Sequence, residues 1–179
     1  MNSKYYIKYW ITLKKKKLIT REYESIFDIK FSKKGLGLII FDIDDTLGEN
    51  EGIISKKAVK YLKELRDEGH KIALISNCNS KREIYLKEVL STVKPAIITK
   101  SDKPNPSSMR KLLKGNNIKY ENIYMIGDRV ATDLYASYLA GIEKRYLVRP
   151  YSEVFGGKRT GFIYRTFRTV ENWVAKNTL

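Results

Sequence analysis

Short hydrophobic runs alternate along this chain with longer stretches in which hydrophobic residues recur every three or four positions. Short runs are typical of buried strands, and the second pattern is typical of amphipathic helices. The runs that we expect to form strands are Leu36–Phe41, Ile72–Ile75, Ala96–Thr99, Ile123–Ile126 and Tyr146–Val148. Because helical stretches separate these runs, the sequence predicts βαβ units in an α/β, Rossmann-like, doubly wound parallel sheet of about five strands.

Residues that begin and end helices support this assignment. Ser55 is placed to cap one helix, and Gly69 is placed to end it. Ser80 precedes Glu83 by the spacing of a capping box, which predicts a second helix reaching about Leu90. Two more helices between strands are expected over 105–115 and about 131–140.

Polar residues directly follow four of the expected strands. In strand order they are Asp42-Ile43-Asp44-Asp45-Thr46, Ser76-Asn77, Lys103-Pro104, and Gly127-Asp128 with Asp133 further on. Ligands of open α/β sheets bind at the carboxyl ends of the strands. We therefore expect these side chains to gather at one edge of the sheet and to form a single site.

These residue types suit the transfer of a phosphoryl group to a carboxylate. Asp42 and Asp44 alternate along an extended segment, so one can attack phosphorus while the other acts as general acid and then general base. Crowded carboxylates repel one another unless a cation lies between them, and oxygen ligands without a His or Cys cluster favour Mg²⁺. We expect Asp42, the backbone carbonyl of Asp44, and Asp128 to bind this ion.

Other polar residues at this edge are expected to bind the substrate's phosphate. Lys103 would neutralise the phosphate and the nucleophile. Thr46, Ser76 and Asn77 would bind phosphoryl oxygens or the nucleophile, which stabilises charge in the transition state. Arg129 is expected to be a solvated arginine, with contact to the substrate as the alternative.

Four segments resemble the motifs of a known family. In order, FDIDDTL, ISN, KP and GDRVATD resemble motifs I to IV of the haloacid dehalogenase (HAD) superfamily of Mg²⁺-dependent phosphatases, over about residues 36–150. Ser25–Ile29 and Leu147–Pro150 extend the resemblance to subfamily IIIA phosphatases of YqeG type, a group that includes mitochondrial phosphatidylglycerophosphate phosphatases. The resemblance implies the HAD fold, Mg²⁺ and an aspartyl-phosphate intermediate.

The resemblance also implies a role for each matching residue. The roles are nucleophile for Asp42, acid and base for Asp44, phosphate binding for Ser76 and Lys103, metal binding for Asp128, and support of the metal's water or of the lysine for Asp133. Two residues depart from the family pattern. Asp45 stands where Asn or Gly is more frequent, and Cys78, which we expect to be a packing residue, stands where Asn is frequent.

The spacing of the motifs leaves no room for a cap domain. About one helix fits between the first two motifs, and a helix and a strand fit between the second and third. The site is therefore expected to be open to solvent, unless the terminal segments or a second subunit cover it. An open site suits a phosphate displayed on something large, such as a lipid headgroup, a protein or a polynucleotide end.

The formal net charge of the 179 residues is +15, from 35 Lys and Arg against 20 Asp and Glu. Most of the excess lies at the ends, with +7 over residues 1–36, +5 over 143–179 and only +3 between them. We therefore expect three parts: a basic, aromatic-rich N-terminal extension packed on or beside the core (1–35), a phosphatase core (36–150), and a basic C-terminal loop and amphipathic helix (151–179).

The C-terminal helix is predicted by a hydrophobic stripe. The stripe contains Ile163, Phe167, Val170 and Val174, while Arg165, Arg168 and Lys176 lie off it. One interpretation is a helix packed on the domain with a solvated basic face. Another is adsorption of both basic ends to an anionic membrane surface. Nucleic-acid contact is a third interpretation and is less favoured, because no nucleic-acid-binding motif accompanies the charge.

We expect a Mg²⁺-dependent phosphomonoester hydrolase, with phosphatidylglycerophosphate as the substrate that the resemblance suggests. One alternative is a HAD phosphatase for a soluble phosphate, a phosphoprotein or a polynucleotide end. Another is a non-catalytic basic module that binds membranes or nucleic acid. A single cysteine excludes an internal disulfide framework and a multi-cysteine zinc site. The N-terminus favours a cytoplasmic protein, peripheral at the membrane, or an organellar matrix protein if the source is eukaryotic.

Overall fold

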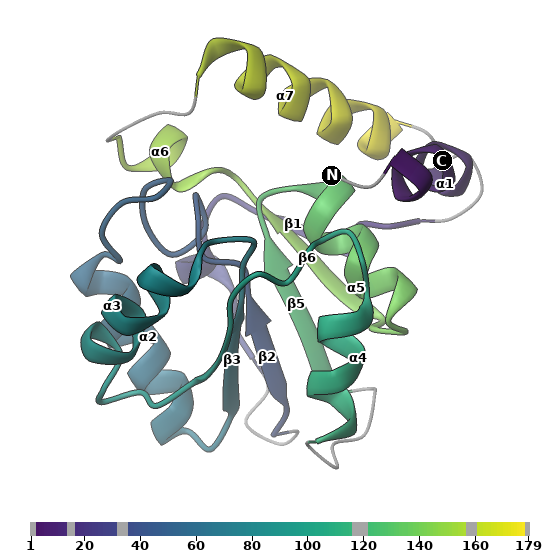
Figure 1. Ribbon diagram of the computed structural model, residues 1–179. Coiled ribbons are helices and arrows are strands. Elements are labelled where there is room, and N and C mark those ends of the chain that lie inside the picture. The colour runs from purple at the N-terminus through teal and green to yellow at the C-terminus, as the bar shows by residue number, and fades with distance from the viewer. Residues whose placement is uncertain (1–2, 14–16, 32–35, 116–121, 157–160, 178–179) are drawn as a thin grey trace.

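The computed structural model describes residues 3–13, 17–31, 36–115, 122–156 and 161–177, and within them six strands form one sheet (Figure 1). The strands are β1 (Arg21–Tyr23), β2 (Leu38–Phe41), β3 (Lys71–Ile75), β4 (Ala96–Ile98), β5 (Ile123–Gly127) and β6 (Lys144–Val148). They lie in the order β1-β6-β5-β2-β3-β4, and every neighbouring pair is parallel. The predicted parallel α/β fold is confirmed.

Strand β2 is hydrophobic along its whole length because both faces of the sheet are covered. It lies between β3 and β5, and all of its residues are buried. Leu38 and Ile40 belong to one hydrophobic core, whereas Ile39 and Phe41 belong to the other. This alternation is what the pleat of a strand between two helical layers requires.

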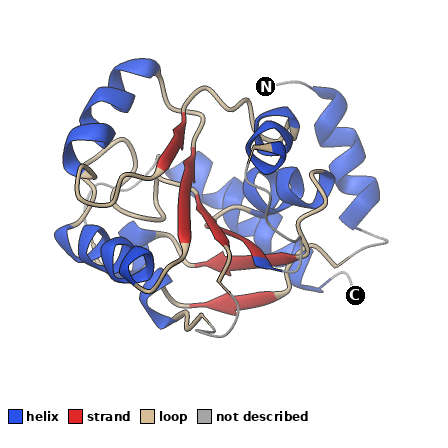
Figure 2. Cartoon of the chain, turned by 90° about the horizontal axis from the view of Figure 1, so that it is seen from below, coloured by secondary structure: helices blue, strands red, loops and turns tan. Residues whose placement is uncertain are grey.

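Helices form the two outer layers, and Figure 2 shows them on both sides of the strands. The first core is covered by α1 (Ser3–Leu13), α4 (Ser107–Lys114) and α5 (Tyr135–Leu139), and the second by α2 (Lys56–Asp67) and α3 (Ser80–Val89). The other helical segments are a 3₁₀ turn (Ile26–Asp28), a π-helical segment (Val130–Leu134), α6 (Tyr151–Val154) and α7 (Phe162–Asn177).

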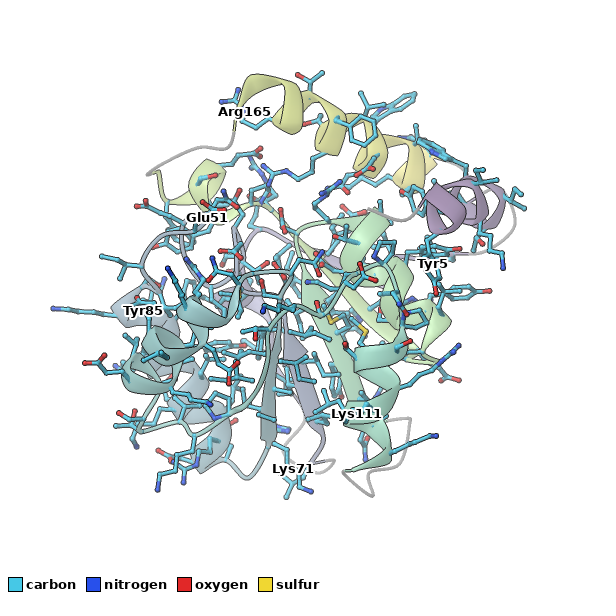
Figure 3. The ribbon with its side chains drawn as sticks, viewed as in Figure 1. Tyr5, Glu51, Lys71, Tyr85, Lys111 and Arg165 are labelled. Atoms are coloured by element: carbon cyan, nitrogen blue, oxygen red, sulfur yellow. The ribbon has the colours of Figure 1, made fainter. Side chains whose placement is uncertain are left out.

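Helix α7 lies across the carboxyl edge of the sheet (Figure 1). In Figure 3, Glu51, from the turn that follows β2, lies near this edge, and Lys71, the first residue of β3, lies at the opposite edge. The edge beneath α7 is therefore the one where the polar motifs are expected to meet.

The sheet has one strand more than the five or so predicted. The additional strand, β1, pairs with β6 at the edge of the sheet and lies within the segment expected to be an N-terminal extension. Its residues, Arg-Glu-Tyr, are largely exposed and contain no hydrophobic run, so the sequence pattern did not reveal it. Upstream of β1, Tyr9 and Leu13 of α1 are buried in the first core.

One predicted helix cap is confirmed and another is wrong. Ser55 caps α2, because its Oγ accepts a hydrogen bond from the amide of Ala58 at 3.1 Å. The expected capping box of Ser80 and Glu83 does not form, since Asn79 is the N-cap of α3. The Glu83 carboxylate instead accepts a hydrogen bond from Thr99. Among the residues described, no helix combines the length and the hydrophobicity needed to cross a membrane.

Candidate active site

The polar residues that follow the strands meet in one pocket at the carboxyl edge of the sheet. The pocket has a volume of about 220 Å³. Seven of the eight predicted site residues line it: Asp42, Asp44, Ser76, Asn77, Lys103, Asp128 and Asp133. The eighth, Thr46, is buried behind Asp42, and its hydroxyl lies 3.5 Å from Oδ2 of that carboxylate.

A buried lysine joins two of the carboxylates. The ammonium group of Lys103 donates hydrogen bonds to Oδ1 of Asp42, to Oδ1 of Asp133 at 2.7 Å, and to the carbonyl of Ile75 at 3.0 Å. Burial acts to lower the pKa of Lys103, but the charges of Asp133 and Asp42 outweigh it, so the pKa lies above its usual value. Lys103 therefore stays charged beside Asp42.

Asp44 is held apart from this cluster. Its Oδ2 accepts a hydrogen bond from the hydroxyl of Ser76 at 3.1 Å, and its Oδ1 pairs with the guanidinium of Arg82 at 2.9 Å. The side chain of Asp44 is 20% exposed, compared with 8% for Asp42. The two aspartates predicted to share the chemistry thus lie in different environments, with Asp44 the one in contact with solvent.

The side chain of Asn77 is bonded to the loop that carries Lys103. Its Oδ1 accepts hydrogen bonds from the Lys103 amide and the Ser101 hydroxyl, both at 2.8 Å. Its Nδ2 donates to the Lys103 carbonyl at 3.0 Å. Asn77 was predicted to bind phosphate, but in this structure its amide group holds the backbone of the lysine.

The fourth motif depends on a glycine for its packing. A Cβ atom at Gly127 would lie 2.6 Å from Oδ2 of Asp133, a distance that real Cβ atoms do not show. The space is needed because Oδ2 of Asp133 also accepts the backbone amide of Arg129 at 3.1 Å. Asp133 is thereby fixed between that amide and Lys103.

Helix α7 contributes an arginine to the site. Nη1 of Arg168 lies 2.7 Å from Oδ2 of Asp128 and 2.9 Å from Oδ2 of Asp45. All three side chains are buried, with 2%, 5% and 2% of their surface exposed. Arg168 was predicted to lie on a solvated or membrane-facing basic surface. That prediction is wrong, because the guanidinium points inward and compensates two buried carboxylates.

Two further residues of α7 face the fourth motif. Glu171, which is almost fully buried, pairs with Arg129 at 2.9 Å. Asn172 donates to the carbonyl of Asp128 at 3.0 Å and accepts from the amide of Val130 at 3.2 Å. Arg129 is therefore a buried, ion-paired residue, and the prediction of a solvated arginine is wrong.

Cys78 lies at the pocket wall and has the character of a packing residue. Burial raises the pKa of its thiol, and the residue packs against the second core. Its backbone amide donates to the Ser76 hydroxyl at 3.0 Å, which orients that hydroxyl. A protonated thiol is a poor nucleophile, so the expected packing role agrees with this environment.

Comparisons with known proteins place this geometry in a family. The family model of the haloacid dehalogenase-like hydrolases matches residues 47–141, just over half of the chain. The chain belongs to this family. It is 28% identical over 155 residues to the protein named "Probable phosphatase YqeG" of Bacillus subtilis (strain 168), a match that covers 83% of each chain. The predicted family and enzyme class, a HAD-type phosphatase, are confirmed.

Two solved structures share the fold of this HAD hydrolase. The core domain of a candidate phosphoglycolate phosphatase from Streptococcus pneumoniae TIGR4 has a TM-score of 0.51 and 23% identity, covering 78% of this chain and 98% of that one. A candidate β-phosphoglucomutase from Thermotoga maritima has a TM-score of 0.53 and 13% identity, covering 74% of this chain and 92% of that one. In this HAD hydrolase, only a turn, α2 and β3 separate the first two motifs, so no cap domain is inserted there.

The donor set of the pocket fits a divalent cation. Asp42, Asp128 and Asp133 each offer a carboxylate oxygen, and these three oxygens lie within 4.8 Å of one another. Burial raises the pKa of Asp42 well above its usual value and that of Asp128 to about 7, although Lys103 and Arg168 act against these shifts. Three carboxylates this close together repel one another, so a cation between them would stabilise the cluster.

The balance of charges leads to the same conclusion. Six carboxylates lie in or behind the pocket: Asp42, Asp44, Asp45, Asp128, Asp133 and the exposed Glu51. The cations paired with them are Lys103, Arg82 and Arg168, while Arg129 is paired with Glu171. The pocket therefore has more carboxylates than cations paired with them, and a divalent cation such as Mg²⁺ would reduce this excess of negative charge. Oxygen donors without sulfur or imidazole suit this ion.

Four residues of the site were not identified from the sequence: Arg82, Arg168, Glu171 and Asn172. Asp45 was noted only as a departure from the family pattern. The conformation of its backbone explains why Asn or Gly is more frequent at this position. Its φ angle is +59°, a left-handed conformation that Gly and Asn adopt most readily. Its side chain accepts the Arg168 guanidinium and the Ser152 amide, so its charge is used in the fold.

Proposed function

We propose that this HAD hydrolase removes the phosphate group of a phosphomonoester through an aspartyl-phosphate on Asp42, with Mg²⁺ as cofactor. The observation that carries the proposal is the environment of Asp42. Its carboxylate is buried at the end of β2, is paired with Lys103, and lies within 4.8 Å of ligand atoms of Asp128 and Asp133. A carboxylate fixed between a cation and a candidate metal site suits nucleophilic attack on phosphorus.

In the first step, Asp42 attacks the phosphorus and the bond from phosphorus to the leaving oxygen breaks. Asp44 gives its proton to that oxygen, so the products are an alcohol and phosphorylated Asp42. In the second step, water attacks the same phosphorus while Asp44 takes one of the water's protons. The bond between phosphorus and Asp42 then breaks, which releases phosphate and restores both side chains.

The surroundings of Asp44 support its role in both steps. The side chain is the more exposed of the two aspartates and can reach a leaving group or a water molecule. The guanidinium of Arg82 and the hydroxyl of Ser76 hold the carboxyl group of Asp44 at the pocket. They also fix its direction, because each bonds a different carboxylate oxygen.

The remaining residues stabilise charge. Lys103 lies where it can neutralise Asp42 and a phosphoryl oxygen, and Asn77 positions it through its backbone. Asp42 and Asp128 would hold Mg²⁺ with the backbone carbonyl of Asp44, and Asp133 orients Lys103 beside them. When bound, Mg²⁺ supplies positive charge that polarises the phosphoryl group.

For the substrate we propose phosphatidylglycerophosphate. The proposal rests on the resemblance to phosphatases of YqeG type, on the absence of an inserted cap domain between the first two motifs, and on the basic ends of the chain. The pocket is small and polar, which suits a phosphate group on a larger molecule rather than enclosure of a whole substrate. A soluble phosphomonoester is the competing substrate.

A substrate panel tests the proposal. Purified protein is assayed for phosphate release from phosphatidylglycerophosphate in mixed micelles and from soluble sugar, nucleotide and peptide phosphates, with Mg²⁺ or with EDTA. We expect Mg²⁺-dependent hydrolysis that is fastest with the lipid. Faster hydrolysis of a soluble phosphate would contradict the proposed substrate, and full activity in EDTA would contradict the proposed cofactor. The variant Asp42→Asn controls for a contaminating phosphatase.

A further inference from the structure

Helix α7 has a polar face and a hydrophobic face. The polar face points toward the protein and the hydrophobic face points toward solvent, which is the reverse of a usual surface helix. The inner face carries Arg168, Glu171 and Asn172, which are bonded to the catalytic motifs. The outer face carries Phe167, Val170 and Trp173. A surface helix normally buries its hydrophobic side chains and exposes its charged ones.

The outer hydrophobic residues are well exposed. Phe167 and Val170 each expose 49% of their surface, and Trp173 exposes 64%. The interpretation in which the hydrophobic stripe packs on the domain is therefore wrong for Phe167 and Val170. Val174 does pack against the first core, and Ile163 lies outside the side chains described. The reason is that ion pairs with the buried carboxylates fix the polar face of α7 inward.

Helix α1 also carries exposed hydrophobic side chains. Its Ile7, Trp10 and Ile11 expose 65%, 38% and 54% of their surface. Figure 1 shows α1 next to the C-terminal end of α7, and residues of both helices pack against the same core. We name the six exposed side chains together the α1/α7 face: Ile7, Trp10, Ile11, Phe167, Val170 and Trp173.

The charged side chains that α1 and α7 themselves expose are basic, although the exposed Glu22 of β1 lies beside Lys176. Helix α1 contains no acidic residue, and the only acidic residue of α7 is Glu171, whose side chain is 1% exposed. Basic residues are present on both helices, including the exposed Lys8 and Lys176. Lys176 also pairs with Glu22 at 2.5 Å. Neither helix therefore presents an exposed acidic side chain next to these aromatic and aliphatic groups.

We infer that the α1/α7 face docks onto a lipid bilayer that contains anionic lipids. Hydrophobic and aromatic side chains can enter the boundary between headgroups and acyl chains, and lysines beside them can contact anionic headgroups. The absence of exposed acidic residues on the two helices matches the negative charge of such a surface. Tryptophan on both helices suits the interface between water and hydrocarbon.

Docking by this face would bring the pocket to the depth of the lipid headgroups, a consequence that rests on the proposed function. An interfacial helix enters the headgroup and acyl boundary by about 5–10 Å, and a helix is about 10 Å thick with its side chains. Arg168 projects from the side of α7 that faces away from the exposed hydrophobic residues, and it contacts Asp128 in the pocket. The catalytic edge would therefore lie level with phosphate groups carried on lipid headgroups.

Vesicle co-sedimentation tests the docking. The full chain is mixed with phosphatidylcholine vesicles that contain or lack phosphatidylglycerol, and the double variant Phe167→Ser/Trp173→Ser is compared with Ile84→Ser. Ile84 is a matched control because it exposes 72% of its surface on α3, away from this face. None of these substitutions changes the charge. Thermal unfolding and hydrolysis of a soluble phosphate report whether each variant is folded.

The wild type and Ile84→Ser are expected to bind the anionic vesicles, with weaker binding at high salt. The double variant is expected to bind at least about tenfold more weakly, with unchanged hydrolysis of the soluble phosphate. Binding of the double variant that equals that of the wild type would overturn the inference. Wild-type protein that binds no better to vesicles with phosphatidylglycerol than to vesicles without it would also overturn it. A wild-type dimer that the double variant abolishes would also overturn it, because the face would then join two copies of the chain.

The two proposals fail in different ways. Hydrolysis of a soluble phosphate without vesicle binding would overturn the docking inference and leave the proposed chemistry in place. Vesicle binding through the α1/α7 face without hydrolysis of any phosphomonoester would contradict the proposed function and leave the docking inference in place.

Discussion

Arg168 lies 2.7 Å from Asp128, although the two residues are 40 positions apart in the chain. The arginine belongs to the C-terminal helix, and the aspartate follows β5 in the centre of the sheet. The same guanidinium contacts Asp45, which follows β2. The C-terminal helix therefore lies at the edge of the sheet that carries the candidate active site and supplies part of its positive charge.

Removing this guanidinium should destabilise the fold. Arg168→Gln leaves Asp128 and Asp45 buried without their cation, which costs about 3 kcal/mol in the free energy of unfolding. Part of the loss should be recovered by Mg²⁺, because the ion would compensate Asp128, which belongs to the candidate metal site. Urea unfolding in EDTA and in Mg²⁺ measures both effects.

Arg165→Gln is the matched control, because it removes the same charge from a half-buried position of α7. It should change the free energy of unfolding by less than about 1 kcal/mol. Equal losses in the two variants, or no loss in Arg168→Gln, would show that the contact with Asp128 contributes nothing specific.

Asp44→Asn should keep the fold and lose catalysis. The amide cannot transfer the proton in either step, so kcat is expected to fall by about 10²–10⁴-fold. The loss should be smaller for substrates with good leaving groups, such as p-nitrophenyl phosphate, because their leaving oxygen needs less help from an acid. Steady-state kinetics with two leaving groups measures this difference, and a kcat close to that of the wild type would rule out proton transfer by Asp44.

Asn77→Ala should act through Lys103. The substitution removes hydrogen bonds to both the amide and the carbonyl of the lysine. We expect kcat/KM to fall about tenfold or more, the equivalent of about 1.4 kcal/mol in the transition state. Asn77→Asp, which keeps the acceptor for the Lys103 amide, should retain more activity than Asn77→Ala. Equal activity of the two variants would contradict a positioning role.

Divalent-cation binding should strengthen as pH rises to about 7. Burial raises the pKa of Asp128 from 3.8 to about 7, against the lowering effect of Arg168, and the pKa of Asp42 shifts in the same direction. A bound cation requires carboxylates, so the affinity should increase by up to about tenfold for each pH unit below 7. Calorimetric titration with Mg²⁺ between pH 5.5 and about 8 measures the affinity. An affinity that falls with rising pH would contradict the assignment of these carboxylates as metal ligands.

The same protons affect stability without metal, and the sign follows from the raised pKa. Between pH 3.8 and about 7 the folded Asp128 keeps a proton that the unfolded chain has lost. The free energy of unfolding in EDTA should therefore decrease as pH rises through this range. Asp128→Asn should flatten this dependence in a urea-unfolding series.

The site core was predictable because parallel strands end at one edge of a sheet. Asp42, Lys103 and Asp128 follow three different strands, and the βαβ pattern alone brings those strand ends together. The inward direction of Arg168 was not predictable in the same way. Its neighbours form a hydrophobic stripe that normally faces a core, and only the buried carboxylates reverse that orientation.

Local patterns were less reliable than the order of the strands. Asn79 and Ser80 are both good caps, and the choice between them depends on where the backbone turns after β3. Strand β1 is held by backbone pairing with β6, and its Arg-Glu-Tyr sequence has no hydrophobic period. In each case a tertiary contact decides between local alternatives.

The central claim is that Asp42 becomes phosphorylated during turnover, and a trapping experiment tests it most directly. Enzyme is mixed with a ³²P-labelled phosphomonoester and Mg²⁺, quenched in acid within the first turnover, and treated with or without hydroxylamine. We predict protein-bound label that hydroxylamine removes and that is absent in Asp42→Asn. Label that survives hydroxylamine, label in Asp42→Asn, or single-turnover hydrolysis by Asp42→Asn at the wild-type rate would contradict the account.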